Sequence, residues 1–145
     1  IVQRSLAPVG EVRTVLPMEE LARFQELTTE VYVDRAVAEY GVALANATRH
    51  PERYGLVRHK EHIAFGSSPR GSINLVHAAR AVALLRGRAY VLPGDVYDLA
   101  RDVLRHRMVL TYQALAEGVT ADQILDGVLA AVPVPRIELA SGATA

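Results

Sequence analysis

The sequence contains no cysteine. This absence excludes a disulfide framework, a cysteine-ligated zinc site and a cysteine nucleophile. A chain without disulfides is compatible with the cytoplasm, which is the location we expect.

The chain also has no net charge, since its 16 basic residues balance its 16 acidic residues. Proteins that neutralise several phosphates of a nucleic acid carry a basic face, so we expect no nucleic-acid partner.

No apolar run approaches the roughly 18 to 20 residues of a membrane span, and residues 1–17 lack the basic-then-apolar order of a signal peptide. The first residue is Ile1 and not methionine, which favours either processing or a piece cut from a longer protein.

A pattern of helices is present instead. Half of the 145 residues are apolar, which is enough for one folded domain. Apolar residues recur with helical spacing, as in the stripe Val37, Tyr40, Gly41, Leu44 and Thr48. Capping residues, prolines and glycines mark the ends. Helices are predicted to begin at Pro17, after the cap Asp34, after the cap Ser68, at Pro93 and after the cap Thr120, with a helical turn at 112–117.

The prediction is therefore an all-α protein, a small helical bundle of about five helices with short extended connections. Residues 1–16 are expected to form an extended lead-in, 17–132 the helical domain and 133–145 a tail. The third helix ends at Gly87 and is apolar on nearly every side, so we expect it to be the buried centre of the bundle.

The histidines and carboxylates do not indicate an active site. His59 and His62 in HKEH stand three residues apart, but a zinc site needs a third and usually a fourth ligand. We interpret them as exposed loop histidines and predict no metal. Helix starts and solvated faces explain the paired carboxylates Glu19 and Glu20, Asp95 and Asp98, and Asp122 and Asp126. Ser67 and Ser68 do not fit the serine-hydrolase frame G-x-S-x-G.

The stretch GSSPRGS at residues 66–72 is the most informative one. Its two glycines imitate a P-loop, but Ser72 stands where that pattern requires lysine. Arg70 falls at the second helical position, where amides point outward and the dipole is positive. A cation is misplaced there unless it shares an anion with those amides. Asn74 and His77 follow on the same face, so Arg70 and Asn74 are the candidate nucleotide-binding residues. The alternative is that Arg70 snorkels or pairs with a nearby acid.

Several linked motifs carry a resemblance to a known family. The runs GSSPRGSINLVHAARAVALLRGRAYVLPGDVYDLARDVLRHRMVL and ALAEGVTADQILDGVLAAVPVP resemble the C-terminal lid domain of the MoxR family of AAA+ ATPases. That family typically shows G-A-S-P-R-A-S, then L-R-G-R-x-Y-V-x-P-x-D-V, then V-L-R-H-R. The upstream VYVDRAVAEYGVALANATRHP resembles its helix leading into the lid, so the resemblance covers roughly residues 15 to 135. Ser67 and Gly71 replace the family's usual alanines, and we expect Gly71 to loosen the first helical turn slightly.

The resemblance implies a role for Arg70, which matches the arginine that reaches from the lid to the ATP phosphates as the second sensor. In the family, the P-loop, the magnesium-binding acidic motif and the arginine finger belong to an α/β domain that would precede Ile1. ATP and Mg²⁺ would then be bound by a longer ATPase, and this fragment alone would hold neither and hydrolyse no ATP. The implied partners are that P-loop domain, neighbouring subunits of a ring homo-oligomer and a von Willebrand factor A-type protein. The implied task is chaperone-like remodelling.

Two other interpretations remain open. One is a stand-alone helical protein-interaction module, which would be favoured if the natural chain began near Ile1. The other is a helical nucleic-acid-binding module, against which the neutral charge and the apolar third helix argue.

Overall fold

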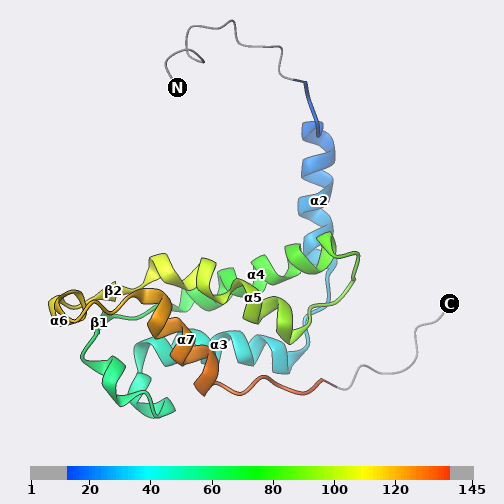
Figure 1. The fold of residues 1–145 in the computed structure, drawn as a ribbon. Coiled ribbons are helices and arrows are strands. Elements are labelled where there is room, and N and C mark those ends of the chain that lie inside the picture. Colours follow the sequence, from blue (N-terminus) through cyan, green and yellow to red (C-terminus); the bar gives the residue numbers. More distant parts are fainter. Residues whose placement is uncertain (1–12, 138–145) are drawn as a thin grey trace, which may run out of the picture.

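The structure is a computed structural model that describes residues 13–137. Most of the expected lead-in 1–16 and of the expected tail 133–145 therefore lies outside the described residues. The described part has six α-helices and a two-stranded sheet (Figure 1). The α-helices are α2 (Met18–Glu30), α3 (Arg35–Arg49), α4 (Pro69–Leu85), α5 (Pro93–Leu104), α6 (Tyr112–Ala116) and α7 (Ala121–Ala131). The predicted all-α bundle is confirmed.

The remaining elements are short. Three 3-10 helices span Pro51–Tyr54, Val57–Lys60 and Arg105–Arg107. Strand β1 (Ile63–Phe65) pairs antiparallel with β2 (Val109–Leu110), with Ile63 opposite Leu110. The segment 51–66 is thus built of two 3-10 turns and a strand, and the segment 108–110 contains β2.

Three predicted helix ends, marked by Asp34, Thr120 and Gly87, are confirmed by their hydrogen bonds and backbone angles. The Asp34 carboxylate accepts a hydrogen bond from the N–H of Ala36 at 2.8 Å. Thr120 and Gln123 form the reciprocal pair of a capping box at the start of α7. Gly87, just after α4, has a φ of 72°, the left-handed conformation that glycine adopts without steric cost.

The core lies where α3, α4, α5 and α7 pack together (Figure 1). Its larger fully buried side chains are aliphatic, and each of these stabilises the fold by ~1.5–3 kcal/mol relative to an exposed position. Those at 0% exposure include Val37, Leu44, Leu75, Val96, Leu104, Ile124 and Leu125. The predicted stripe on α3 is buried throughout.

The third predicted helix, α4, is not the buried centre of the bundle, so that prediction was wrong. One side of α4 buries Leu75, Ala79 and Ala83 against α3 and α5. The other side leaves Ile73 more than half exposed. An apolar composition alone did not show which side of the helix lacks a neighbour.

Helix α2 lies mostly outside the core. Figure 1 shows it projecting from one end of the bundle, where it meets α4. It buries no residue, and its apolar side chains Met18, Leu21 and Phe24 are exposed. Among the described residues, no helix is long and apolar enough to cross a membrane.

Asp95 is a buried charge that joins the end of α4 to the start of α5. Its side chain is 1% exposed. It accepts hydrogen bonds from Arg86 at 2.7 Å, from Arg88 at 2.6 and 2.8 Å, and from the N–H of Leu92 at 2.8 Å. The expectation that a simple helix-start role explains Asp95 was therefore incomplete, because the carboxylate also fixes the preceding Arg-Gly-Arg turn.

The pKa of Asp95 reflects these contacts. Burial alone would raise the pKa, but the hydrogen bonds from Arg88, from the Leu92 N–H and from Arg86 outweigh it and hold the pKa below its ordinary value. A carboxylate with a depressed folded-state pKa stabilises the fold at a pH above the unfolded pKa of about 4. That stabilisation is lost as the pH falls through the folded-state value.

We predict that Asp95→Asn lowers the free energy of unfolding at pH 7 by roughly 2–3 kcal/mol. This is below the ~3–5 kcal/mol of a fully buried pair because water can reach Arg86. Urea denaturation of the 145-residue chain measures it. The difference from wild type should shrink as the pH falls below about 4. Asp98→Asn, which removes an exposed partner of Arg86, is the control and should cost much less. An equal loss in both variants, or a loss that does not change with pH, would contradict this account.

Candidate functional site

The loop Gly66–Ser68 leads from β1 into α4 and places Arg70 at the second helical position, as predicted. Ser68 is the N-cap by backbone position, and its carbonyl accepts the N–H of Gly71 at 2.8 Å. Its side chain makes no capping hydrogen bond, so the predicted side-chain cap was wrong. Pro69, which fixes its own φ, begins the helix in its place.

Gly66, the first glycine of the stretch that imitates a P-loop, has a packing role. A Cβ on Gly66 would lie 2.3 Å from the carbonyl oxygen of Thr48 on α3. Gly66 has no positive φ. Glycine is therefore needed here because the loop backbone passes too close to the end of α3 to leave room for a side chain.

Gly71 and Ser67 share one small space. A Cβ on Gly71 would lie 2.0 Å from the Ser67 hydroxyl oxygen and 3.3 Å from Leu104. Ser67 is fully buried. The two residues that depart from the family's alanines thus compensate each other, because the serine hydroxyl occupies the volume of the missing methyl group. The expected loosening of the helix by Gly71 leaves out this contact.

Arg70, Asn74 and His77 are all exposed on one side of α4. Within residues 13–137, the side chain of Arg70 makes no hydrogen bond or ion pair. Several other arginines do pair with carboxylates, namely Arg35, Arg86, Arg88, Arg101 and Arg105. The alternative that Arg70 pairs with a nearby acid therefore finds no such acid in the described residues.

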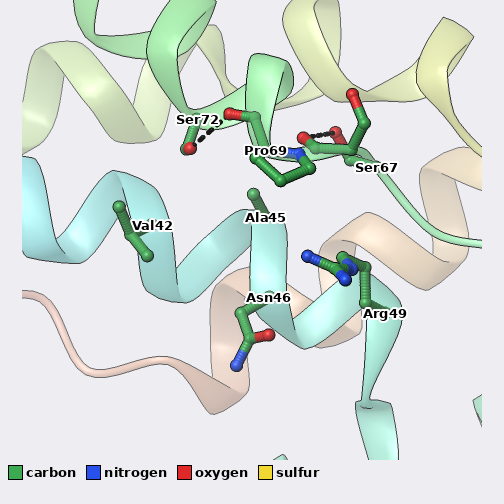
Figure 2. A pocket seen from close by; sticks show the side chains of 8 residues that line it. Val42, Ala45, Asn46, Arg49, Ser67, Pro69 and Ser72 are labelled. Atoms are coloured by element: carbon green, nitrogen blue, oxygen red, sulfur yellow. Dashed lines mark hydrogen bonds between the residues drawn. The ribbon is translucent and has the colours of Figure 1, made fainter.

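A hollow of about 160 Å³ lies between α3 and the start of α4. Figure 2 shows Val42, Ala45 and Arg49 of α3 on one side of it and Ser67, Pro69 and Ser72 on the other. A second hollow of about 220 Å³ shares Val42 and Ser72 and continues along the same two helices to His77. Neither reaches the ~300–1,000 Å³ of a pocket that encloses a small molecule. This surface can form one wall of a ligand site.

The α3 residues of this site were not predicted from the sequence. Asn46 and Arg49 line the first hollow, and the Asn46 amide donates a hydrogen bond to the Tyr54 hydroxyl at 3.2 Å. Both residues lie on α3. Their closeness to Thr48 is the one feature of the sequence that relates them to this site.

His62 is buried, so its interpretation as an exposed loop histidine was wrong. It is 8% exposed, and its Nε2 lies 3.0 Å from a Glu117 carboxylate oxygen. Hydrogen bonds from Gln113 and from His62 lower the pKa of Glu117. His59 packs its ring against Gly127. The pKa of His59 is lowered mainly by burial and to a smaller extent by the nearby His62. In the described part of the chain, no three His, Asp or Glu side chains are grouped to hold a metal.

This chain is similar in sequence to known AAA lid domains and MoxR proteins. A family model described as an AAA lid domain matches residues 56–128. The chaperone MoxR1 of Mycobacterium tuberculosis is 40% identical over 137 residues, which are 94% of this chain and 36% of that protein. Protein MoxR of Paracoccus denitrificans is 38% identical over 106 residues, 69% of this chain and 31% of that protein.

A solved structure is also similar to this chain in fold. A crystal structure from Cytophaga hutchinsonii, provisionally described as an ATPase, superposes with a TM-score of 0.83 at 32% identity. The match covers 93% of this chain and 42% of that one. The chain thus spans well under half the length of these relatives.

The four-helix body, the loop into α4 and the family match define a lid domain of the AAA+ type. The chain belongs to the AAA lid domain family, and within it to the lids of MoxR-family ATPases.

We predict that Gly71→Ala destabilises the chain and that adding Ser67→Ala restores it. The single change forces a methyl group onto the buried hydroxyl, which should cost roughly 1–2 kcal/mol. The double variant removes that hydroxyl and gains the helix propensity of alanine. Denaturant unfolding of both single variants and the double variant measures the coupling. Gly94→Ala, where a Cβ meets nothing within 4 Å, is the control. Additive effects of the two substitutions would refute the shared-space explanation.

A second prediction concerns the His59–His62 pair. Its ring centroids lie 6.0 Å apart, and the Glu117 contact occupies the Nε2 of His62. Treatment with a chelator should therefore leave the melting temperature unchanged. A drop of several degrees that added zinc reverses would show that the pair is a structural metal site.

Proposed function

We propose that this chain is the second-sensor lid of a MoxR-like ATPase. In this proposal Arg70 reaches across a cleft to the β- or γ-phosphate of ATP, and Asn74 lies beside it on the same helix face. The nucleotide is bound on a P-loop domain of the longer protein. The observation that carries the proposal is an exposed guanidinium without a carboxylate partner, within residues 13–137, at the positive end of a 17-residue helix.

The electrostatics of this position favour an anion. At the N-terminus of a helix, the first N–H groups lack intrahelical partners and carry partial positive charge. Arg70 adds a full charge with donors that suit two phosphate oxygens at once. Because both charges have the same sign, an anion outside the helix stabilises both together.

This chain would contribute only part of the ATP site. The hollows beside Ser67 and Ser72 are too small to enclose a nucleotide, and the described residues show no group of ligands suited to Mg²⁺. A divalent ion bound with ATP neutralises charge on the transferred phosphoryl group. The lid's own contribution would be the Arg70 guanidinium, which neutralises phosphate charge from the opposite side.

An ATP site shared between this chain and a P-loop domain allows nucleotide binding to be coupled to movement of the two. When a phosphate group lies between two rigid bodies, its presence or loss changes the angle between them. We propose that such closure drives chaperone-like remodelling of partner proteins by a ring of neighbouring subunits, with a von Willebrand factor A-type protein as a further partner. The mycobacterial relative is named a chaperone, which supports the remodelling role.

A second candidate function is a stand-alone protein-interaction module. The observation that favours it is an apolar surface around the β1–β2 pair, where Phe65, Val109, Tyr112 and Leu115 are more than half exposed beside a hollow of about 510 Å³. In such a module Arg70 would have no connection to ATP.

We predict that Arg70→Ala in the longer ATPase slows ATP turnover by at least about tenfold. Arginines that stabilise phosphoryl-transfer charge reach about 10³ to 10⁵ in the strongest cases, and a sensor that also governs closure contributes less. Arg70→Lys should restore turnover only in part, because lysine cannot present two parallel donors. Steady-state phosphate release measures both.

The control for Arg70 is Arg53→Ala, which removes another exposed arginine from a 3-10 turn. It should leave turnover unchanged. The isolated 145-residue chain should hydrolyse no ATP and should keep its melting temperature when Arg70 is replaced. Wild-type turnover in Arg70→Ala would favour the interaction module instead.

A further inference from the structure

We propose that Thr48 is a positioning residue for Arg70, through a contact in which its hydroxyl holds the loop that begins α4. The inference rests on the proposed function of Arg70, because positioning has meaning only if the guanidinium has a target. It adds a residue on a different helix, 22 positions earlier in the chain, to the machinery of the site.

Thr48 lies in the last turn of α3 and is fully buried. Its hydroxyl donates to the carbonyl of Ala45 at 2.7 Å and accepts the N–H of Ser67 at 2.9 Å. The first bond fixes the hydroxyl rotor, so that a lone pair of the oxygen faces the loop. The second bond satisfies a loop N–H that is shielded from water, since Ser67 is 0% exposed.

The same turn of α3 also holds the residue before Ser67. The backbone of Gly66 lies so close to the Thr48 carbonyl that a Cβ would approach it to 2.3 Å. The loop therefore touches Thr48 twice, once through its backbone carbonyl and once through its hydroxyl. Together these contacts fix the distance of the loop from α3 and the path of its backbone.

The connection from this anchor to Arg70 is short and stiff. Only Ser68 and Pro69 separate Ser67 from Arg70, and the proline ring fixes one of the dihedral angles between them. No side-chain cap at Ser68 holds the helix start independently. The hydroxyl of Ser72 bonds the Pro69 carbonyl at 2.7 Å, which stiffens the first turn but ties it to nothing outside α4. Thr48 is thus the side chain through which α3 fixes the starting point of α4.

Replacing Thr48 with valine keeps the shape of the side chain and removes the oxygen. The Ser67 N–H then has no acceptor in a dry environment, so the loop must shift toward another partner or toward water. A shift of about 1 Å at a group that contacts a reacting phosphate can cost as much as 10²-fold in rate. Thr48→Ser keeps the oxygen and loses only a methyl group.

The test is a double-mutant cycle on ATP turnover in the longer ATPase, using Thr48→Val, Arg70→Ala and the double variant. We expect Thr48→Val to lower kcat about fivefold in the presence of Arg70, and by less than about twofold when Arg70 is already alanine. Thr48→Ser should stay within about twofold of wild type. This rescue separates the hydroxyl from the volume of the side chain.

Val37→Ala is the matched control for general destabilisation. It opens a cavity in the same helix, at a fully buried position outside the last turn of α3. It should lower the melting temperature and leave kcat unchanged at a temperature where the protein is folded. Should Thr48→Val prove unfolded at the assay temperature, Thr48→Ser carries the test, and a kcat as low as that of Arg70→Ala in the folded serine variant would overturn the proposal.

The outcomes distinguish this inference from the function on which it rests. If Arg70→Ala turns over ATP like wild type, the proposed function fails. If Arg70→Ala is slow but Thr48→Val slows both backgrounds by the same factor, Arg70 keeps its function and Thr48 has no part in positioning it. A Val37→Ala variant that loses as much kcat as Thr48→Val would equally overturn the positioning role.

Discussion

The candidate site depends on the crossing of the Gly66–Ser67 segment over the last turn of α3. At that crossing the Thr48 hydroxyl accepts the Ser67 N–H at 2.9 Å, and Gly66 leaves no room for a side chain against the Thr48 carbonyl. Buried backbone groups must be paired, so a loop that passes this close to a helix end needs an acceptor on that helix. A threonine in an otherwise apolar stripe supplies it. The loop that begins α4, and with it the N-terminal turn that carries Arg70, lies against α3 at this contact.

The opposite end of α4 is fixed by a charge. Arg86 and Arg88 lie on either side of Gly87, whose left-handed φ turns the chain back so that both guanidinium groups reach Asp95 at the start of α5. The cost of burying one carboxylate is offset by two arginines and a backbone N–H. Helix α4 is thus attached to α3 at its first turn and to α5 at its last. Between these ends Ala79 and Ala83 have small side chains that allow close packing.

Local signals made much of this fold predictable. Asp34, Thr120 and Gly87 act within a few residues of themselves, so the helix ends they mark could be read from short stretches of sequence. The same is true of Arg70 at the second position of α4, because Pro69 marks the first position. The burial of Asp95 and His62 could not be predicted this way. Each depends on a partner that the chain brings back after a turn or, for Glu117, from 55 residues away.

The glycines of GSSPRGS show that the spacing of a motif does not reveal what each of its residues does. Their spacing imitates a phosphate loop, but Gly66 is required by a backbone in α3 and Gly71 by the hydroxyl of Ser67. Both reasons are non-local or depend on a neighbouring side chain, so the spacing of the glycines could not reveal them. The exposed face of α4 was missed for a similar reason. Composition says that a helix is apolar, but only packing decides which side is covered.

Arg70 differs from the paired arginines in what surrounds it. Where arginines lie near carboxylates in this structure, as Arg101 does beside Asp126, the pair forms at ordinary hydrogen-bond distances. Arg70 lies where helix geometry puts partial positive charge, and the described residues supply no compensating acid. A charge so placed is unfavourable by ~0.3–1 kcal/mol in the isolated helix, from the interaction with the helix dipole alone. An anion held from outside reverses the sign of that interaction. Under the proposed function, the lid would therefore gain stabilisation when Arg70 meets a phosphate in the closed arrangement and lose it when the phosphate leaves.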